Sequence, residues 1–189
     1  MIRAAVIGSI GSGKTFVAKL FKCPVFNADN EVKIIYQTNK ACFQKLNKIL
    51  PSYIKSFPIK KTELLEAISK DKKNLKKISY VVHPLVRQKM NLFLKKNKSK
   101  KIVILDIPLL LENNLDKKND ILVFVKSKKK EILKRLKKRK NFNMKIFNNF
   151  KKIQLSLVLK KKKSQFIIKN NFKNNSVKVR VKEIIKNLV

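Results

Sequence analysis

The sequence has little of several residue types, and each shortage excludes a class of protein. Its single histidine, His83, excludes a histidine-rich metal centre and a zinc helix with two histidines. The two cysteines, Cys23 and Cys42, are too few for a disulfide framework and too far apart for a CxxC motif, so we expect reduced, buried thiols. No uncharged apolar run approaches the roughly 18 residues of a membrane-spanning helix, and the amino terminus resembles a strand rather than a signal peptide. These features predict a soluble cytoplasmic protein.

Acidic residues are also scarce, with 11 Asp and Glu against 48 Lys and Arg and a formal net charge of +37. One interpretation is nucleic-acid binding, because Lys and Arg that neutralise phosphates dominate that affinity. The other is a compositional bias toward residues with A/T-rich codons, because the excess is mostly Lys and accompanies abundant Asn and Ile. We favour the second and expect no specific nucleic acid partner, although any basic surface binds polyanions at low salt.

The length and the apolar content are those of a globular protein. A chain of 189 residues suits one compact domain with a real core. Its hydrophobic content of 44% excludes a wholly disordered chain. No Gly/Ser-rich linker divides the sequence and no internal repeat is present, so we expect residues 1–189 to form a single domain. The oligomeric state is left open.

A glycine-rich turn near the amino terminus carries the strongest signal. An apolar run at residues 2–7 leads into Gly8-Ser9-Ile10-Gly11-Ser12-Gly13-Lys14-Thr15, which matches the phosphate-binding pattern G-x-x-x-x-G-K-[ST] at every fixed position. A strand before the pattern and a helix after it let the loop backbone surround phosphate oxygens. Lys14 is expected to reach the β- and γ-phosphates of ATP, and the Thr15 hydroxyl to ligate Mg²⁺. The predicted ATP contacts in this stretch are Gly8, Ile10, Gly11, Ser12, Gly13, Lys14, Thr15 and Phe16.

Further apolar runs predict the rest of a sheet. They are residues 25–26, 101–105, 121–125 and 165–168, and helical segments separate them. Runs without period-two alternation are typical of strands covered on both faces, so the sequence predicts an α/β protein with a five-stranded parallel sheet flanked by helices. We expect the second strand to lie beside the first, which would make Asp29 a neighbour of the phosphate loop at the carboxyl edge of the sheet.

A mostly helical interval separates the second and third predicted strands. Residues 30–50 predict one helix, and residues 74–98 predict a long helical stretch interrupted at His83-Pro84. The whole interval, residues 30–100, exceeds a minimal crossover connection and predicts an acceptor-binding excursion.

Two basic helical stretches precede the last strand. The first is residues 131–140, and the second is residues 141–163, whose apolar side chains recur at core-like helical spacing. Within residues 128–163 these stretches would form a basic lid that closes over a nucleotide and excludes water, which otherwise competes as acceptor. A phosphate loop, a carboxylate at a strand end and a basic lid are the equipment of a small-molecule kinase.

The sequence resembles the dephospho-CoA kinases along nearly its whole length. The motifs that carry the resemblance, in chain order, are the phosphate loop, Asn27-Ala28-Asp29, His83-Pro84-Leu85-Val86-Arg87, Asp106-Ile107-Pro108-Leu109-Leu110-Leu111-Glu112, Lys134-Arg135-Leu136 with Arg139, Gln154, and Phe166-Ile167-Ile168-Lys169-Asn170. The His-Pro-Leu and Pro-Leu-Leu-x-Glu elements are specific when they occur together, whereas the phosphate loop alone is common to many kinases.

The resemblance implies transfer of the γ-phosphate of ATP to the ribose 3′-hydroxyl of dephospho-CoA, with ATP and Mg²⁺ as cofactors. In this sequence Asp29 matches the catalytic carboxylate, Arg87 the site for acceptor phosphates, Arg139 the lid over ATP, and Asn170 the loop near adenine. Pro108 and Glu112 belong to the acceptor side. His83 is a weaker substrate contact, because we expect it to cap a helix before Pro84. Asp106 would either assist Mg²⁺ or cap its strand end, with equal weight.

Some positions depart from the family pattern. Asn27 replaces the first Asp of D-A-D, Lys169 replaces an Asp, and the R-x-x-x-E-K-like pattern after Gln154 is lost. Asn27 keeps hydrogen bonding but removes charge, so it should weaken metal or hydroxyl polarisation without abolishing it. The lid differences leave the arginine roles open.

Two alternatives remain at this point. A kinase for another small acceptor, such as a nucleoside monophosphate, would not be expected to share His83 to Arg87 together with Pro108 to Glu112. A basic nucleic-acid-binding P-loop protein would explain the charge but lacks an aromatic-rich RNA-binding motif.

Overall fold

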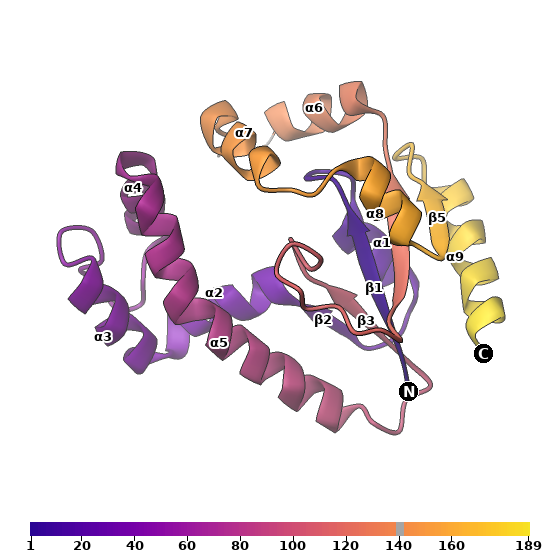
Figure 1. Cartoon of the computed structure of the whole chain (residues 1–189), viewed down its shortest axis with the longest axis horizontal. Helices are drawn as coiled ribbons and strands as arrows, with labels where there is room; N and C mark the ends of the chain where they lie inside the picture. Colours follow the sequence, from indigo (N-terminus) through magenta and orange to yellow (C-terminus); the bar gives the residue numbers. More distant parts are fainter. Residues whose placement is uncertain (139–141) are drawn as a thin grey trace. The chain divides into compact units, whose positions relative to one another are not determined.

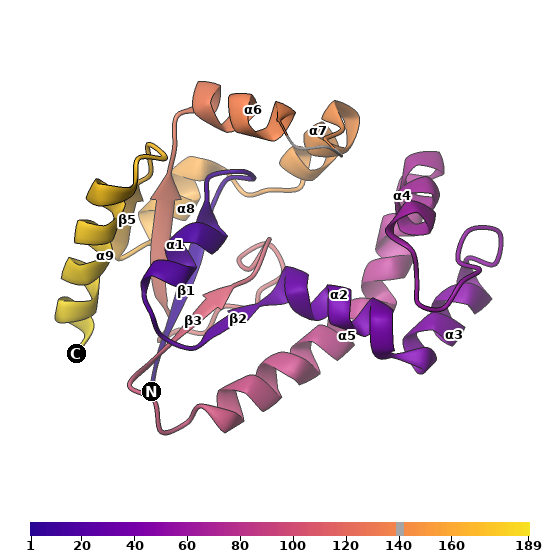
Figure 2. The same cartoon turned by 180° about the vertical axis from the view of Figure 1, so that it is seen from behind.

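The computed structural model describes residues 1–138 and 142–189 and divides them into two compact units (Figures 1 and 2). The first unit consists of Met1–Asn27 and Asn97–Val189, and the second of Ala28–Lys96. The second unit coincides closely with the helical interval expected at residues 30–100. None of the helices in these described ranges is long and apolar enough to cross a membrane.

A five-stranded parallel sheet forms the centre of the first unit, as predicted. Its strands are β1 (Ile2–Gly8), β2 (Val25–Asn27), β3 (Ile102–Asp106), β4 (Ile121–Lys126) and β5 (Phe166–Lys169), in the order β2-β3-β1-β4-β5. The expectation that β2 lies beside β1 is wrong, because β3 pairs with both of them. Every residue of β3 is buried, so this strand needs a neighbour on each side, whereas β2 is short and half-buried at its ends, as suits an edge.

Helices cover both faces of this sheet. Helices α1 (Lys14–Leu20) and α9 (Asn174–Leu188) pack on one face, and α8 (Leu157–Lys163) packs against β1 and β4 on the other (Figures 1 and 2). The core beneath α1 and α9 is built from small and branched side chains of the strands and from the inner faces of the helices. Its buried members include Ala4, Val6, Val17, Phe21, Ile104, Val123, Ile168, Val181 and Ile184.

The basic stretch before β5 differs from its prediction. Helix α6 (Lys129–Lys137) is followed by α7 (Met144–Lys152) and α8, so the described part of the second helical stretch consists of two helices. The Ser156 hydroxyl accepts a hydrogen bond from the Leu159 N–H at 3.1 Å and caps α8 at its new start. The expected packing of the apolar stripe is also wrong in its second half, because Leu157 and Val158 are exposed.

The second unit has a core of its own. Helices α2 (Ala28–Thr38), α3 (Lys40–Ile49), α4 (Lys61–Lys70) and α5 (Lys72–Lys96) enclose a buried cluster that includes Ile35, Cys42, Leu46, Ile54, Leu64, Ile78 and Val82. The single helix predicted for residues 30–50 is broken at Asn39, whose side chain accepts a hydrogen bond from the Cys42 N–H at 2.8 Å. Helix α5 continues through Pro84, so His83 lies inside the helix and does not cap one.

Candidate active site

The loop between β1 and α1 depends on glycine. All three glycines of the chain, Gly8, Gly11 and Gly13, lie in it, and each has a positive φ. A Cβ on Gly13, where φ is +90°, would overlap the Asn170 side chain, and a Cβ on Gly8 would lie 2.6 Å from the Val125 carbonyl oxygen. The close backbone approach that a phosphate cradle requires is therefore built into the packing around the loop.

Lys14 turns back over this loop. Its Nζ donates to the Ser9 carbonyl oxygen at 2.9 Å and lies 3.5 Å from that of Gly8. Thr15 and Phe16, which follow in the first turn of α1, are exposed. The Lys14 ammonium and the Thr15 hydroxyl thus lie near the carboxyl end of β1, at the edge where parallel sheets bind ligands.

Residues that directly follow β4 and β5 hold the loop in place through hydrogen bonds. The carbonyl oxygen of Ser12 accepts hydrogen bonds from the Asn170 amide nitrogen at 2.8 Å and from the Ser127 hydroxyl at 3.0 Å. Asn170 is 2% exposed, and its backbone N–H donates to the Lys126 carbonyl at 2.8 Å. Asn170, which the sequence places near adenine, therefore contacts the loop backbone itself, and Ser127 carries no motif that could have identified it.

Helix α6 packs against the same loop. A Cβ on Gly11 would lie 2.9 Å from a methyl group of Ile132 and 3.1 Å from Leu136, both on α6. The guanidinium carbon of Arg135 lies 4.3 Å from the ring centroid of Phe172, in the loop after β5. Residues 129–137 are thus fixed beside the loop, whereas Arg139, the predicted lid arginine, lies outside the described residues.

A pair of side chains joins the carboxyl ends of β2 and β3. Asn27 and Asp106 occupy matching positions in the register of these strands, and the Asn27 side-chain amide donates to Oδ2 of Asp106. Asp106 is 2% exposed. The uncharged amide that departs from the family pattern therefore satisfies a buried carboxylate that a second carboxylate would repel.

Three predicted acceptor-side residues belong to the second unit. Asp29 lies in the first turn of α2, and Arg87 lies one turn after His83 on α5; Asp29 and Arg87 are exposed, and His83 is half-buried. Burial, and then the positive charge of Arg87, lower the pKa of His83 from its usual value. A neutral imidazole next to a cation is suited to hydrogen bonding rather than to charge pairing.

The compact turn after β3 holds the remaining predicted acceptor residues. Pro108 is exposed, whereas Leu110 and Leu111 are buried and anchor the turn. Oε1 of Glu112 accepts from Lys160 Nζ at 2.6 Å and from the Leu155 N–H at 2.9 Å. Lys160 escaped sequence reasoning, because it lies in a run of four lysines and no local pattern separates it from its neighbours.

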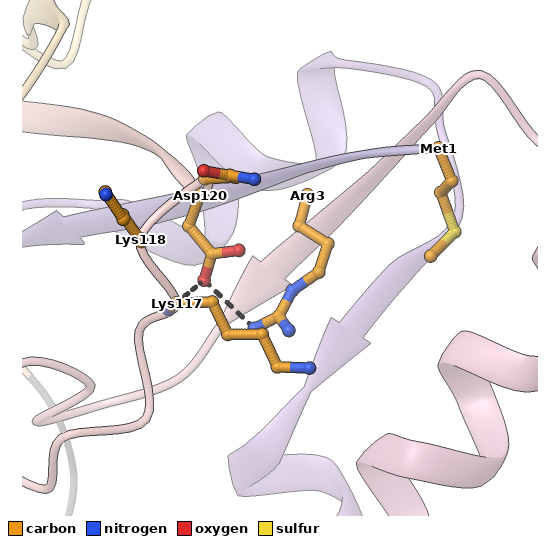
Figure 3. Close-up of a pocket in the computed structure, with 6 residues that line it drawn as sticks. Met1, Arg3, Lys117, Lys118 and Asp120 are labelled. Carbon is orange, nitrogen blue, oxygen red and sulfur yellow. Dashed lines mark hydrogen bonds and ion pairs between the residues drawn. The ribbon is translucent and has the colours of Figure 1, made fainter.

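A hollow of about 270 Å³ lies near the amino-terminal ends of β1 and β4, away from the phosphate loop (Figure 3). Arg3 near the start of β1 donates to Oδ2 of Asp120, just before β4, at 2.9 Å, and the Lys117 N–H donates to the same oxygen at 2.9 Å. Burial raises the pKa of Asp120, and the Lys117 N–H and the Arg3 charge oppose that rise. These contacts hold β4 to β1 at the edge where parallel sheets do not bind substrates.

Comparisons with known proteins agree with this geometry. The family model for dephospho-CoA kinase matches residues 3–176. The dephospho-CoA kinase of Wolbachia pipientis wMel is 32% identical over 97% of this chain and 96% of that protein, and that of Rickettsia typhi is 32% identical over 100% and 98%.

Two solved structures share the fold. The Thermus thermophilus protein TT1252 superposes with a TM-score of 0.81 at 24% identity over 100% of this chain and 98% of that one. The dephospho-CoA kinase from Campylobacter jejuni superposes with a TM-score of 0.66 at 21% identity over 98% and 96%. The fold is therefore that of a P-loop kinase, and the chain belongs to the dephospho-CoA kinase family.

Proposed function

We propose that this chain performs the reaction of its family, the transfer of the γ-phosphate of ATP to the ribose 3′-hydroxyl of dephospho-CoA, which yields coenzyme A and ADP. The observation that carries the proposal is a phosphate loop complete in sequence and braced by Asn170, in a chain that the family model matches over residues 3–176. A kinase of small molecules needs accurate positioning of both reactants more than covalent chemistry of its own.

On the ATP side, Lys14 would exchange its bonds to loop carbonyls for the β- and γ-phosphates. The backbone of residues 8–15 would hold the same phosphates, and Asn170 would keep that backbone in place through Ser12. Thr15 and Phe16 follow Lys14 in the first turn of α1 and are further proposed ATP contacts. Arg139 is the proposed lid contact, as the resemblance implies.

The residues present suit Mg²⁺ that arrives together with ATP. Across residues 1–138 and 142–189, no group of three His, Cys, Asp or Glu side chains is arranged to hold a metal ion by itself. The Thr15 hydroxyl and the buried carboxylate of Asp106 are oxygen donors of the kind that Mg²⁺ takes as partners beside phosphate. When bound, the ion would offset negative charge on the phosphates.

On the acceptor side, Asp29 would orient the 3′-hydroxyl and remove its proton, which requires a carboxylate that stays charged. Asp29 is exposed in the first turn of α2, so its carboxylate is accessible to an incoming hydroxyl. Arg87, also exposed, would bind phosphate groups of dephospho-CoA, since a guanidinium pairs with phosphate through two parallel hydrogen bonds. His83 and Pro108 are further proposed acceptor contacts.

An assay of ADP release tests the proposal. The purified chain would receive ATP and Mg²⁺ with dephospho-CoA, with adenosine monophosphate, or with no acceptor. We expect dephospho-CoA alone to stimulate ADP release. Equal stimulation by adenosine monophosphate would instead identify a nucleotide kinase, and release independent of any acceptor would identify an ATPase. Both substrates are small and water-soluble, so the proposed location is the cytoplasm.

A further inference from the structure

Glu112 and Lys160 form a buried ion pair beside the phosphate loop. The side chain of Lys160 is 3% exposed and that of Glu112 9% exposed, and Nζ lies 2.6 Å from Oε1. The other three lysines of the same run, residues 161–163, are exposed. Because removing an ammonium group from water costs several kcal/mol even after relaxation, its burial at this one position of α8 calls for an explanation that compositional bias cannot supply.

The local contacts hold the pair in a fixed place. Glu112 follows Leu110 and Leu111, whose buried side chains anchor the turn after β3. The same carboxylate oxygen accepts from the Leu155 N–H at 2.9 Å, so Glu112 ties down the segment that leads into α8 as well as Lys160 itself. Oε2 of Glu112 is buried and has no hydrogen-bond partner among the residues that the structure describes, so the pairing with Lys160 and Leu155 uses one oxygen of the carboxylate.

The ammonium of Lys160 belongs to the surroundings of the phosphate loop. A narrow hollow on the α8 face of the sheet is lined by Gly8 and Lys14 from the loop together with Glu112 and Lys160. Helix α8 packs against β1, the strand that ends in the loop (Figure 1). The ammonium groups of Lys14 and Lys160 and the carboxylate of Glu112 therefore line one hollow at the carboxyl end of β1.

We propose that Lys160 is a second cation of the active site, after Lys14, that interacts with the phosphates of ATP. Glu112 is then a positioning residue that holds Lys160, and does not itself bind the acceptor. When the phosphates of ATP bind beside Lys14, they would attract the Lys160 ammonium more strongly than the single carboxylate oxygen of Glu112 does. The charge that develops on the transferring phosphoryl group would then be shared by two lysines. This inference rests on the phosphotransfer proposed above.

A purely structural ion pair makes a different prediction for a neutral replacement. Glu112→Gln combined with Lys160→Met removes both charges and keeps the approximate volume, and such replacements of buried pairs commonly preserve or improve stability. If the pair only supports the fold, this double variant should keep wild-type turnover. If Lys160 acts on phosphate, the double variant should fold and still lose turnover by about 10²-fold, the scale of one removed electrostatic contact.

The single variant Glu112→Gln gives a second test, through the melting temperature measured with and without ATP. It leaves Lys160 charged, buried and without its carboxylate, so the free enzyme should melt at a lower temperature. Binding of ATP would supply the missing negative charge, and we expect ATP to raise the melting temperature of this variant more than that of the wild type. A structural role predicts an equal or smaller shift.

The experiment therefore measures turnover and ATP-dependent melting for the wild type, Glu112→Gln, Lys160→Met and the double variant, with Lys182→Met on the outer side of α9 as an exposed lysine control. Among the variants, only the control Lys182→Met is expected to keep both the turnover and the ATP-dependent melting shift of the wild type. Wild-type turnover in the double variant, or an unenlarged ATP shift in Glu112→Gln, would overturn it. An inactive wild type would instead reject the phosphotransfer itself, so the two failures are distinguishable.

Discussion

The two compact units hold their proposed functional residues in different ways. In the first unit, the phosphate loop is set by its surroundings: Gly13 fits against Asn170, Gly8 fits against β4, and Ser12 accepts two hydrogen bonds from neighbouring elements. In the second unit, Asp29 and Arg87 are exposed side chains on helices whose core is built from other residues. The proposed ATP contacts are thus coupled to the stability of the fold, whereas the proposed acceptor contacts Asp29 and Arg87 are exposed side chains that can be replaced separately.

The largest effect should come from Lys14→Ala. Loss of the ammonium would remove the proposed contact to the β- and γ-phosphates, and we expect turnover to fall by about 10³-fold or more. The assay is ADP release with dephospho-CoA. Lys19→Ala on the same helix is the matched control, because Lys19 is exposed and should be dispensable. Normal turnover in Lys14→Ala would reject the assignment of the loop.

Asp29→Asn should separate the two sides most clearly. A positioned base contributes about 10² or more to the rate, so turnover should fall by that factor while ATP affinity stays unchanged. The melting temperature should change by only a few degrees, because the side chain is exposed. Calorimetric titration with ATP and thermal unfolding measure both quantities, and Glu66→Gln removes an exposed carboxylate of the same unit as a control. Unaltered turnover would exclude Asp29 from the mechanism.

Asn170→Ala should affect stability and ATP binding together. It removes one of the two donors to the Ser12 carbonyl oxygen, at a cost of about 0.5–1.5 kcal/mol in the free energy of unfolding. A loosened loop should also raise the KM for ATP roughly tenfold. Asn171→Ala, at the exposed next position, should cost much less on both scales. A change in only one of the two quantities would contradict the coupling of loop and fold.

His83 should give the smallest effect, through pH. Burial and Arg87 lower its folded-state pKa, while the unfolded chain keeps a value of about 6.5. Below that pH the unfolded chain binds the proton more readily, so stability falls as the pH drops from about 6.5 through the folded-state value. We expect the wild type to lose more melting temperature between pH 8 and pH 5.5 than His83→Gln. The same loss in both proteins would show that His83 does not titrate in this way.

Local patterns predicted the parts of the structure that depend on neighbours in sequence. The phosphate loop and the five strands follow from residue types within a few positions. The order of the strands does not, because the position of β3 between β1 and β2 depends on which strand is buried on every side. The break at Asn39 was missed because apolar spacing continues across it, and only the Asn39 cap reveals the boundary.

The site was predictable in its motifs and less so in its contacts. Lys14 and Thr15 are named by the loop pattern, and Asp106 by its strand end. The contact between Asn170 and Ser12 joins residues 158 positions apart, and the pairing of Glu112 with Lys160 selects one lysine from a run of four. Such choices depend on burial in the folded chain, which neither composition nor spacing reports.

The family assignment also narrows the interpretation of the charge. A net charge of +37 by itself suits a nucleic-acid-binding protein. The match of the dephospho-CoA kinase model over residues 3–176 and the parallel sheet account for the chain without such a role. Lys160 marks the one position in its run where the lysine is buried and paired.

Identification of the product tests the central claim most directly. After incubation of the chain with ATP, Mg²⁺ and dephospho-CoA, phosphorus and proton NMR of the purified product would locate the new phosphate on the ribose. We predict a phosphate ester at the 3′-oxygen together with one equivalent of ADP. A phosphate at another position, or ADP and free phosphate with unchanged dephospho-CoA, would contradict the proposed function.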